Sequence, residues 1–310
     1  MKRIAVPGRA SPPPPAAEPG VWRRLGRSPA ARISLAVIVF YLLLAAWGCS
    51  GWELPDWRTV NYARAYQGPS PAHPFGTDIH GRDVLAKTVI GARTALTVAF
   101  LASVLAVAIG LILGLLAGYL GGAVDGIITW VYSTLESVPY YLLILAFAFV
   151  LQDRSINLWG MEFRLEGINA VYLALGLTGW VGLCRLIRGE VIKRREGEYV
   201  LAARSLGASP LRVMFRHLAP NVLHVVIVTF TLGFVSYIHA EVVLSFLGLG
   251  AKEVPSWGVM IDESKLELAR GVWWQLLAAS LAIFGISLAL HVFGDALRDA
   301  LDPRTRGTKR

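Results

Sequence analysis

Four side chains that could bind a divalent metal ion stand close together ahead of a long apolar segment. They are His73, Asp78, His80 and Asp83. Imidazole nitrogens and carboxylate oxygens are ligands that such ions take in proteins. The same stretch carries Gly76, Thr77 and Gly81, which are typical of turns and caps, and an amphipathic run begins directly afterwards at Val84. We predict that the stretch orients the start of the apolar segment and holds no metal.

Signatures of enzyme chemistry are missing from the sequence. No lysine follows a glycine, so the phosphate-binding loop G-x-x-x-x-G-K-[ST] does not occur, and neither H-E-x-x-H nor G-x-S-x-G is present. The two cysteines, Cys49 and Cys184, are far apart and give no disulfide framework or zinc spacing. We therefore expect no cofactor on this chain and no catalytic residues, and any ATP that drives its function must be hydrolysed on another subunit.

Two acidic residues lie inside apolar segments, where a charged side chain costs about 3 kcal/mol or more. Glu136 and Glu241 could each line a water-filled path or pair with a donor on a neighbouring helix. Both interpretations stay open for Glu241. Glu136 shortly precedes Pro139, so we expect it to have a structural role near a kink. Three histidines are expected to form hydrogen bonds inside the bundle: His224, His239 and His291.

The apolar segments that would position these acids dominate the composition. Of the 310 residues, 55% are hydrophobic and 16% are charged, and the mean hydropathy is +0.54. These values are typical of a membrane protein. Six windows are long enough to cross a hydrocarbon core of about 30 Å. They cover residues 33–48, 94–120, 127–151, 168–187, 222–249 and 272–294. We predict an all-α membrane protein with six transmembrane helices.

Positive charge is distributed unevenly among the connections between these windows. Lysine and arginine gather before the first window, between the fourth and fifth, and after the last. Because these residues are enriched on the cytoplasmic side of membrane proteins, both termini and the segment 198–220 should be cytoplasmic. Orientation and attraction to anionic lipid head groups then explain the net charge of +9, and no nucleic acid is needed.

The N-terminal region is rich in proline and predicts a disordered cytoplasmic tail over residues 1–30. Residues 31–93 would hold the first transmembrane helix and an external loop, residues 94–302 the core domain, and residues 303–310 a second cytoplasmic tail. An alternative interpretation takes the basic cluster, the first window and Cys49 as a signal peptide with a lipid-modified cysteine.

Small residues recur at every fourth position along the second window. The stripe consists of Ala102, Ala106, Gly110, Gly114 and Gly118. Small side chains at this spacing let a second helix approach closely, and packing contacts drive helix association in lipid. The stripe predicts a tightly packed helix bundle.

The basic segment 198–220 lies between two strongly apolar windows. Its first residues favour helix, Gly207 suits a left-handed helix end, and Ser209 with Pro210 supplies an N-cap and a helix start. These signals predict a helix, a turn and a second helix. Such a unit would lie on the membrane surface or insert into a groove on another protein. One face of the first helix is apolar: Tyr199, Ala202, Ala203 and Leu206.

The stretches "AARSLG" and "RHLAPN" within this segment resemble the cytoplasmic signature of the membrane subunits of binding-protein-dependent ABC importers. The matching positions are Ala202, Ala203, Gly207 and Pro220, whereas Leu201, His217 and Ala219 depart from the general pattern. Two further stretches, "HPFGTDIHGRDV" and "LSFLGLG" with "PSWG", resemble the dipeptide, oligopeptide and nickel branch. That branch usually carries an acid at the position of Ser133, and Glu136 lies one turn further on.

The resemblance implies a type I ABC importer permease for peptides in the inner membrane of a bacterium. The chain would pair with a second, different permease, two ATPase subunits that bind ATP and Mg²⁺, and an external solute-binding protein. A passage would form between the two permeases. Alternatives are import of nickel or another small solute, an ion-driven secondary transporter that uses Glu136 and Glu241, and a membrane enzyme, for which no catalytic constellation is visible.

The resemblance also assigns expected roles to residues. The ATPase would be contacted through the segment that contains Glu198, Ala202, Ala203, Gly207 and Pro220. A bulky side chain at Gly114 is expected to impair assembly with the partner permease, because it would push apart helices that need close approach.

Overall fold

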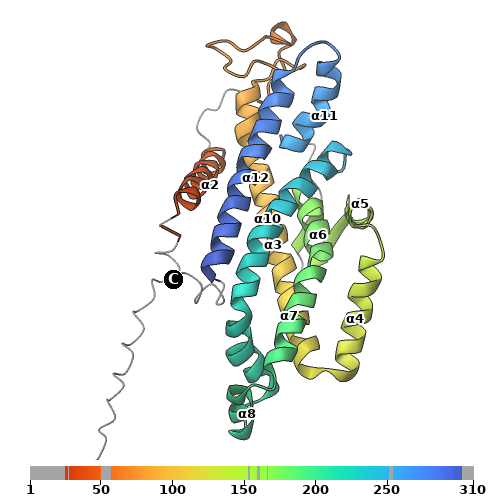
Figure 1. The fold of residues 1–310 in the computed structure, drawn as a ribbon. Helices are drawn as coiled ribbons and strands as arrows, with labels where there is room; N and C mark the ends of the chain where they lie inside the picture. Colours follow the sequence, from red (N-terminus) through yellow and green to blue (C-terminus); the bar gives the residue numbers. More distant parts are fainter. Residues whose placement is uncertain are drawn as a thin grey trace, which may run out of the picture.

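The computed structural model describes residues 25–26, 28–49, 57–152, 154–158, 161–165, 167–250 and 254–301. Most of these residues form long helices that stand side by side (Figure 1). The predicted tail 303–310 and most of the predicted tail 1–30 lie outside the described residues, so their disorder stays a prediction.

The first described long helix, α2 (Pro29–Trp47), begins where the local sequence favours a helix start. Ser28 Oγ accepts the N–H of Ala31 at 3.3 Å, and Pro29 takes the first helical position. The helix therefore begins inside the predicted tail. The hydroxyl of Tyr41 donates to the carbonyl of Ala282 at 2.9 Å, which ties α2 to α12 (Trp274–Leu301).

The second window belongs to a longer helix, α3 (Val84–Leu120). Asp83 caps its start, because the Oδ1 atom accepts the N–H of Ala86 at 2.9 Å. The amphipathic run that begins at Val84 is therefore the first part of α3 itself. The helix ends at Gly121, whose φ of +66° is accessible to glycine.

The third window does not form one straight helix. It is divided into α4 (Gly122–Glu136) and α5 (Tyr140–Leu151), and the two axes meet at 97°. Pro139 lacks an N–H and disfavours helical conformation at Val138, so the helix breaks there. In the described residues five helices are long and apolar enough to cross a membrane, or six if the bent pair counts as one.

The fourth window forms one continuous span over residues 168–194. It comprises α6 (Ile168–Gly179) and α7 (Val181–Arg194), which meet at Trp180. Ahead of α6, β1 (Arg154–Leu158) and β2 (Met161–Leu165) form an antiparallel pair in which Ile156 lies opposite Phe163. The chain is mostly helical, as predicted, and this short hairpin in the connection between the third and fourth windows was not predicted.

The remaining elements occupy both ends of the molecule. Segment 198–220 contains α8 (Glu198–Ser205), α9 (Pro210–Arg212) and a π-helix (Val213–Leu218), and α10 (Ala219–Phe246) follows without a break. A short helix, α11 (Trp257–Leu268), precedes α12 and was not predicted. A single 3₁₀ turn, η1 (Tyr62–Arg64), lies in the loop before α3. Figure 1 places α8 and α11 at opposite ends of the long helices.

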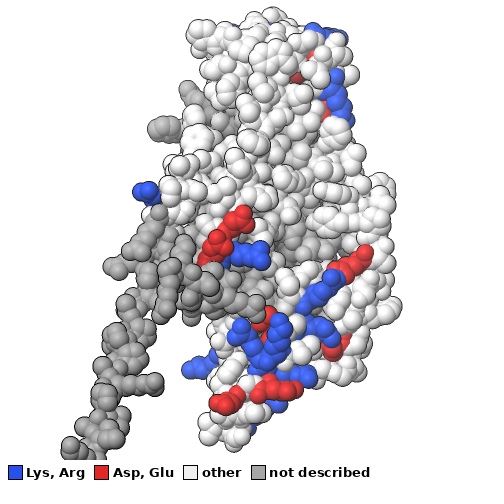
Figure 2. All heavy atoms as spheres, in the orientation of Figure 1, with Lys and Arg blue, Asp and Glu red and all other residues white. Residues whose placement is uncertain are grey.

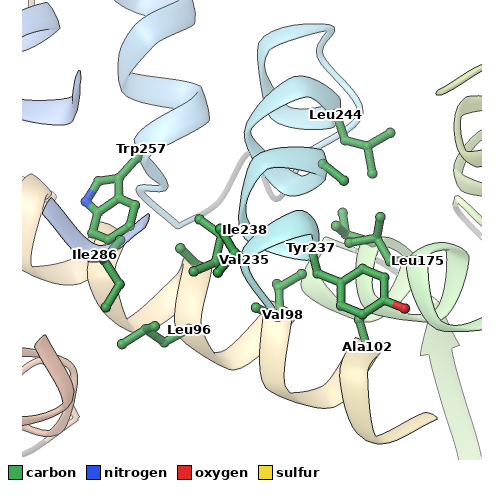
Figure 3. Packing of buried hydrophobic residues seen from close by; sticks show 14 of the residues in the cluster. Leu96, Val98, Ala102, Leu175, Val235, Tyr237, Ile238, Leu244, Trp257 and Ile286 are labelled. Carbon is green, nitrogen blue, oxygen red and sulfur yellow. The ribbon is translucent and has the colours of Figure 1, made fainter. Parts of the chain in front are cut away.

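The core is built where α3, α6, α10 and α12 meet. Figure 3 shows Leu96 and Val98 of α3 near Val235 and Ile238 of α10, with Trp257 of α11 beside them. The Trp257 ring is fully buried, and its Nε1–H donates to the carbonyl of Thr88 at 3.0 Å. A second cluster joins α3 and α7 to the segment 198–220. Side-chain packing thus continues from the helix bundle into the segment 198–220.

The stripe of small residues on α3 faces α7 of the same chain. A Cβ atom at Gly110 would lie 2.9 Å from the carbonyl oxygen of Trp180, and one at Gly118 would lie 2.7 Å from Cβ of Val191. Ala102 and Ala106 are buried in the same helix. The close approach predicted from the stripe is therefore made within this chain, whereas the sequence had suggested an effect on assembly with a partner.

We expect Gly114→Leu to destabilise the chain itself. A Cβ at Gly114 would lie 2.7 Å from Cβ of Ile187, so α3 and α7 must separate, at a cost of about 1 to 3 kcal/mol. The measurement is the thermal unfolding midpoint of the purified chain. Gly126→Leu is the matched control, because no described atom lies within 4 Å of a Cβ there. Equal unfolding midpoints for the two variants would show that α3 and α7 tolerate separation.

Candidate coupling segment and charged sites within the spans

Segment 198–220 projects beyond the bundle as two short helices joined by a tight turn. Gly207 has a φ of +80°, which ends α8, and Ala208 N–H bonds back to the carbonyl of Ala203 at 3.0 Å. Ser209 Oγ accepts the N–H of Arg212 at 3.4 Å, and Pro210 starts the second helix. The local signals in the sequence therefore gave the correct helix, turn and helix.

The inner face of this segment is attached to α3 and α7. Val200 and Ala203 of α8 are buried with Leu115 and Tyr119 of α3 and with Val191 of α7. A polar contact adds to this packing: Arg204 lies over the ring of Tyr119 at 4.8 Å and donates from Nε to its hydroxyl at 3.1 Å. A displacement of α8 would therefore act directly on two long helices.

The outer face differs from the one predicted. Ala203 faces the bundle, because α8 uses that side for its own packing, whereas Glu198, Tyr199, Ala202, Gly207 and Pro220 are exposed. Apolar side chains dominate the projecting surface, and the exposed fraction of Leu206 reaches 88%. The other large apolar side chains on this surface are Leu201, Leu211 and Phe215. Figure 2 shows lysine and arginine gathered at the end of the molecule where Figure 1 places α8.

A π-helix separates this surface from α10. The N–H of Ala219 bonds to the carbonyl of Met214, five residues earlier. Pro220 has no N–H, and its ring crowds the carbonyl four residues back, which favours a widened turn. The Asn221 side chain donates to the carbonyl of His217 at 2.7 Å. Such turns are frequent at functional sites.

The two acids predicted as pathway candidates have different surroundings. Glu241 is 2% exposed on α10, and its Oε1 atom accepts the hydroxyl of Ser245 at 2.7 Å. Its Oε2 atom has no hydrogen-bond partner among the described residues. Ser256, at the start of α11, donates to Ser245 at 3.3 Å. Glu241 is thus buried inside the protein. Its contacts through Ser245 and Ser256 connect α10 to α11.

Glu136 ends α4 and forms an ion pair with Arg185 of α7. The exposed fractions of the two side chains are 39% and 52%, so this pair lies on the surface of the chain. A second ion pair joins the same helices, because Arg188 donates to both carboxylate oxygens of Asp125 at 2.5 and 2.7 Å. Glu136 is at a kink, as expected, and it also lines a cavity. Arg185 was not among the predicted site residues, although an arginine inside an apolar window is itself a signal of such a site.

The residues considered as metal ligands instead organise the loop before α3. Asp83 caps α3 and accepts His73 Nδ1 at 2.8 Å, and Asp78 accepts the N–H groups of His80 and Arg82, both at 2.9 Å. In the part of the chain that the structure describes, no group of three or more histidine, cysteine or acidic side chains is arranged to hold a metal ion.

A buried ionic cluster links this loop to α11 and α12. Lys87 of α3 is 1% exposed and donates to Asp78 at 2.8 Å, to Gln275 at 3.0 Å and to Glu263. Arg82 donates to Asp78 at 2.7 Å and to Glu263 at 2.8 Å. Burial alone would raise the pKa of Asp78, but the neighbouring Lys87 and Arg82 outweigh it and lower the pKa.

A third acid beside this cluster behaves differently. Glu267 of α11 is fully buried, and its Oε1 atom accepts the N–H of Ile79 at 2.8 Å. Burial raises the pKa of Glu267, because hydrogen bonding and the nearby Lys87 do not compensate for the lost hydration. These contacts fasten the loop before α3 to α11 over a large separation in sequence.

The chain is similar to known transport proteins over most of its length. The chain is 36% identical to the dipeptide transport system permease protein DppC of Bacillus subtilis over 288 residues. The aligned region covers 92% of this chain and 85% of the relative. It is 34% identical to the oligopeptide transport system permease protein OppC of the same organism, over 89% of this chain and 86% of the relative.

A third relative is the glutathione transport system permease protein GsiD of Shigella dysenteriae, which is 33% identical over 92% of this chain and 90% of its own length. Residues 110–307 match the family described as "Binding-protein-dependent transport system inner membrane component". That match includes the projecting segment 198–220, both ion pairs between α4 and α7, and Glu241. This chain therefore belongs to the family of binding-protein-dependent transport system inner membrane components.

Proposed function

We propose that the chain is a permease subunit of an ATP-driven importer of peptides in the inner membrane of a bacterium. It pairs with a second permease, and the passage forms between them. Two ATPase subunits and an external solute-binding protein complete the transporter. The names of the relatives support this proposal, because they are permeases for dipeptides, oligopeptides and glutathione. Catalysis is assigned to the ATPase subunits, which bind ATP and Mg²⁺.

The observation that carries the proposal is the construction of the segment 198–220. Its outer face presents exposed leucines beside arginines, and its inner face is packed against α3 and α7. A surface of this kind suits insertion into a groove on another protein. Movement of that protein would be transmitted to the long helices through Val200, Ala203 and Arg204. We assign the segment to contact with an ATPase.

The proposed arrangement has six spans with both termini in the cytoplasm. The bent pair α4 and α5 counts as one span, and α8 faces the cytoplasm while α11 faces outward. Residues 31–93 contribute the first span and an external loop, and residues 94–302 form the core with its coupling segment 198–220. The lysine and arginine distribution supports this orientation.

The uptake test uses proteoliposomes that contain both permeases and the ATPases, with ATP inside and a loaded binding protein outside. We expect uptake of a labelled dipeptide to require ATP and the binding protein. Uptake that persists without ATP and stops when an ion gradient is removed would identify an ion-driven transporter instead. Uptake of Ni²⁺ in place of peptide would change the substrate but keep the assembly.

Orientation can be tested with single cysteines. We expect a cysteine at Ser209 to react with an impermeant maleimide only from the cytoplasm, and one at Leu266 to react only from outside. Leu266 is suitable because it is 68% exposed, whereas Ser256, at the start of the same helix, is fully buried. The background chain carries Cys49→Ser, since Cys49 is exposed. External labelling of the Ser209 position in sealed cells would contradict the proposed topology.

A further inference from the structure

The ion pair between Glu136 and Arg185 places one carboxylate inside the proposed membrane region. At about 1.5 Å per residue, Glu136 lies roughly 14 Å inside the third apolar window, which begins at residue 127, and Arg185 lies roughly 3 Å inside the cytoplasmic end of the fourth window, which ends at residue 187. A hydrocarbon core is about 30 Å thick. Figure 1 shows α4 and α7 standing side by side, and Asp125 is paired with Arg188 nearer their shared end. Glu136 is therefore placed at intermediate depth, and Arg185 reaches it from nearer the cytoplasmic edge of the membrane.

Charges that are exposed at this depth cannot face lipid without a large cost. Side chains of this kind face a water-filled space or another chain. Glu136 and Arg185 keep 39% and 52% of their surfaces accessible in the isolated chain. Glu136 and the guanidinium that it binds are therefore assigned to the interior of the assembly, which in the proposed importer is the passage between the two permeases.

A cavity of about 340 Å³ adjoins Glu136. It forms where the broken span of α4 and α5 meets the junction between α6 and α7, at which Trp180 keeps a helical conformation and the two helices count as one span. Its lining includes Glu136, Pro139, Tyr140, Thr178, Gly179 and Gly182. Interrupted helices at mid-membrane depth commonly build substrate sites in transporters, because their ends present backbone dipoles to charged groups.

The electrostatics of the pair favour one class of ligand. In the empty site the carboxylate and the guanidinium neutralise each other. A ligand that carries both an ammonium and a carboxylate can exchange partners with the pair and leave no charge unpaired. A ligand with a single charge would leave either Glu136 or Arg185 without a partner within the membrane region, which is less favourable than the exchange of both charges. The guanidinium is also suited to bidentate binding of a carboxylate.

The geometry points to a subsite for zwitterionic peptides at this position, in which Glu136 accepts the peptide ammonium and Arg185 donates to the peptide carboxylate. This inference rests on the proposed function, because the pair faces a passage only in the assembled importer. It names two residues of the permease that select the charge pattern of the cargo after the binding protein has released it.

The first test measures binding without transport. Saturation-transfer NMR on the purified permease and ATPase complex, without binding protein, compares alanyl-alanine with its C-terminal amide and its N-acetyl form at pH 7. We expect at least tenfold weaker binding of each blocked peptide, and loss of alanyl-alanine binding in Glu136→Gln. Equal binding of all three peptides by the wild-type complex, or none by any, would overturn the inference. The comparison of the three peptides uses the wild-type complex, so it does not depend on the folding of a variant.

The second test distinguishes a ligand site from a brace between α4 and α7. We expect Glu136→Gln and Arg185→Gln each to lower uptake of alanyl-alanine at least tenfold, and the exchanged pair Glu136→Arg with Arg185→Glu to stay equally low. The exchange restores attraction between the helices but reverses the charges offered to a ligand delivered in one orientation. Recovery to within twofold of the wild type would show that the pair is a brace.

Arg194→Gln is the control for these variants. Arg194 belongs to the same helix, and its pairing with Glu190 lies away from the cavity. We expect uptake within twofold of the wild type. The failure of the subsite and the failure of the proposed function give different results. If the wild-type complex shows ATP-dependent uptake and only the charge tests fail, the subsite alone is wrong. Absence of ATP-dependent uptake in the wild type would reject the importer.

Discussion

Replacing Lys87 by methionine is expected to lower the free energy of unfolding by about 3 to 5 kcal/mol. The ammonium group is almost fully buried and is shared by Asp78, Glu263 and Gln275. Methionine fills a similar volume but leaves one fully buried carboxylate, that of Asp78, with Arg82 as its remaining cationic partner. The cost comes from the uncompensated charge, which cannot regain its hydration inside the protein.

The measurement is the thermal unfolding midpoint of the purified chain at neutral pH. Lys265→Met makes the same chemical change on α11, where the side chain is about half exposed and pairs with Asp262 at 2.7 Å. Exposed pairs contribute about 1 kcal/mol or less, so this control should unfold close to the wild type. If Lys87→Met unfolded at the same temperature as Lys265→Met, the buried cluster would not be a major source of stability.

The apolar windows could be predicted because hydropathy depends only on the local sequence. α2, α3, α10 and α12 include the predicted windows, apart from residue 48, residues 247–249 and residues 272–273, which lie just beyond the helix ends. Pro139 indicated a kink. The size of the bend, 97°, depends on how α5 packs against α6, and the proline alone does not predict it. α11 and the hairpin are short and only partly apolar. Their stability comes from contacts such as the burial of Trp257, so their sequences alone gave no strong signal.

The candidate sites could likewise be predicted where their geometry is local, and could not where it depends on tertiary contacts. Gly207, Ser209 and Pro210 have local roles, so the turn between α8 and α9 was predictable residue by residue. The partners of Glu136 and Lys87 come from distant parts of the chain, and only the tertiary packing brings them together. The inward orientation of Ala203 was likewise decided by the packing of α8 on Tyr119 and Val191.

Gly207→Val is expected to uncouple ATP hydrolysis from transport. The φ of +80° at this residue is unfavourable for a β-branched side chain by about 1 to 2 kcal/mol. No described atom lies within 4 Å of a Cβ at this position, so the substitution causes no steric clash. The chain can relieve the strain by changing the angle between α8 and α9. Such a change would move Leu206 relative to Leu211 and alter the surface that we assign to the ATPase.

The experiment compares ATPase activity of the reconstituted complex with and without loaded binding protein, together with dipeptide uptake. We expect the Gly207→Val chain to insert and to copurify with the second permease, because the spans are unchanged, but to lose stimulation and uptake at least tenfold. Gly207→Asn is the matched control, since asparagine tolerates positive φ far better than valine, and it should retain both activities. If Gly207→Val kept both the stimulation and the uptake, the angle of this turn would not transmit ATPase movement, and the segment would be better explained as a helix pair that lies on the membrane surface.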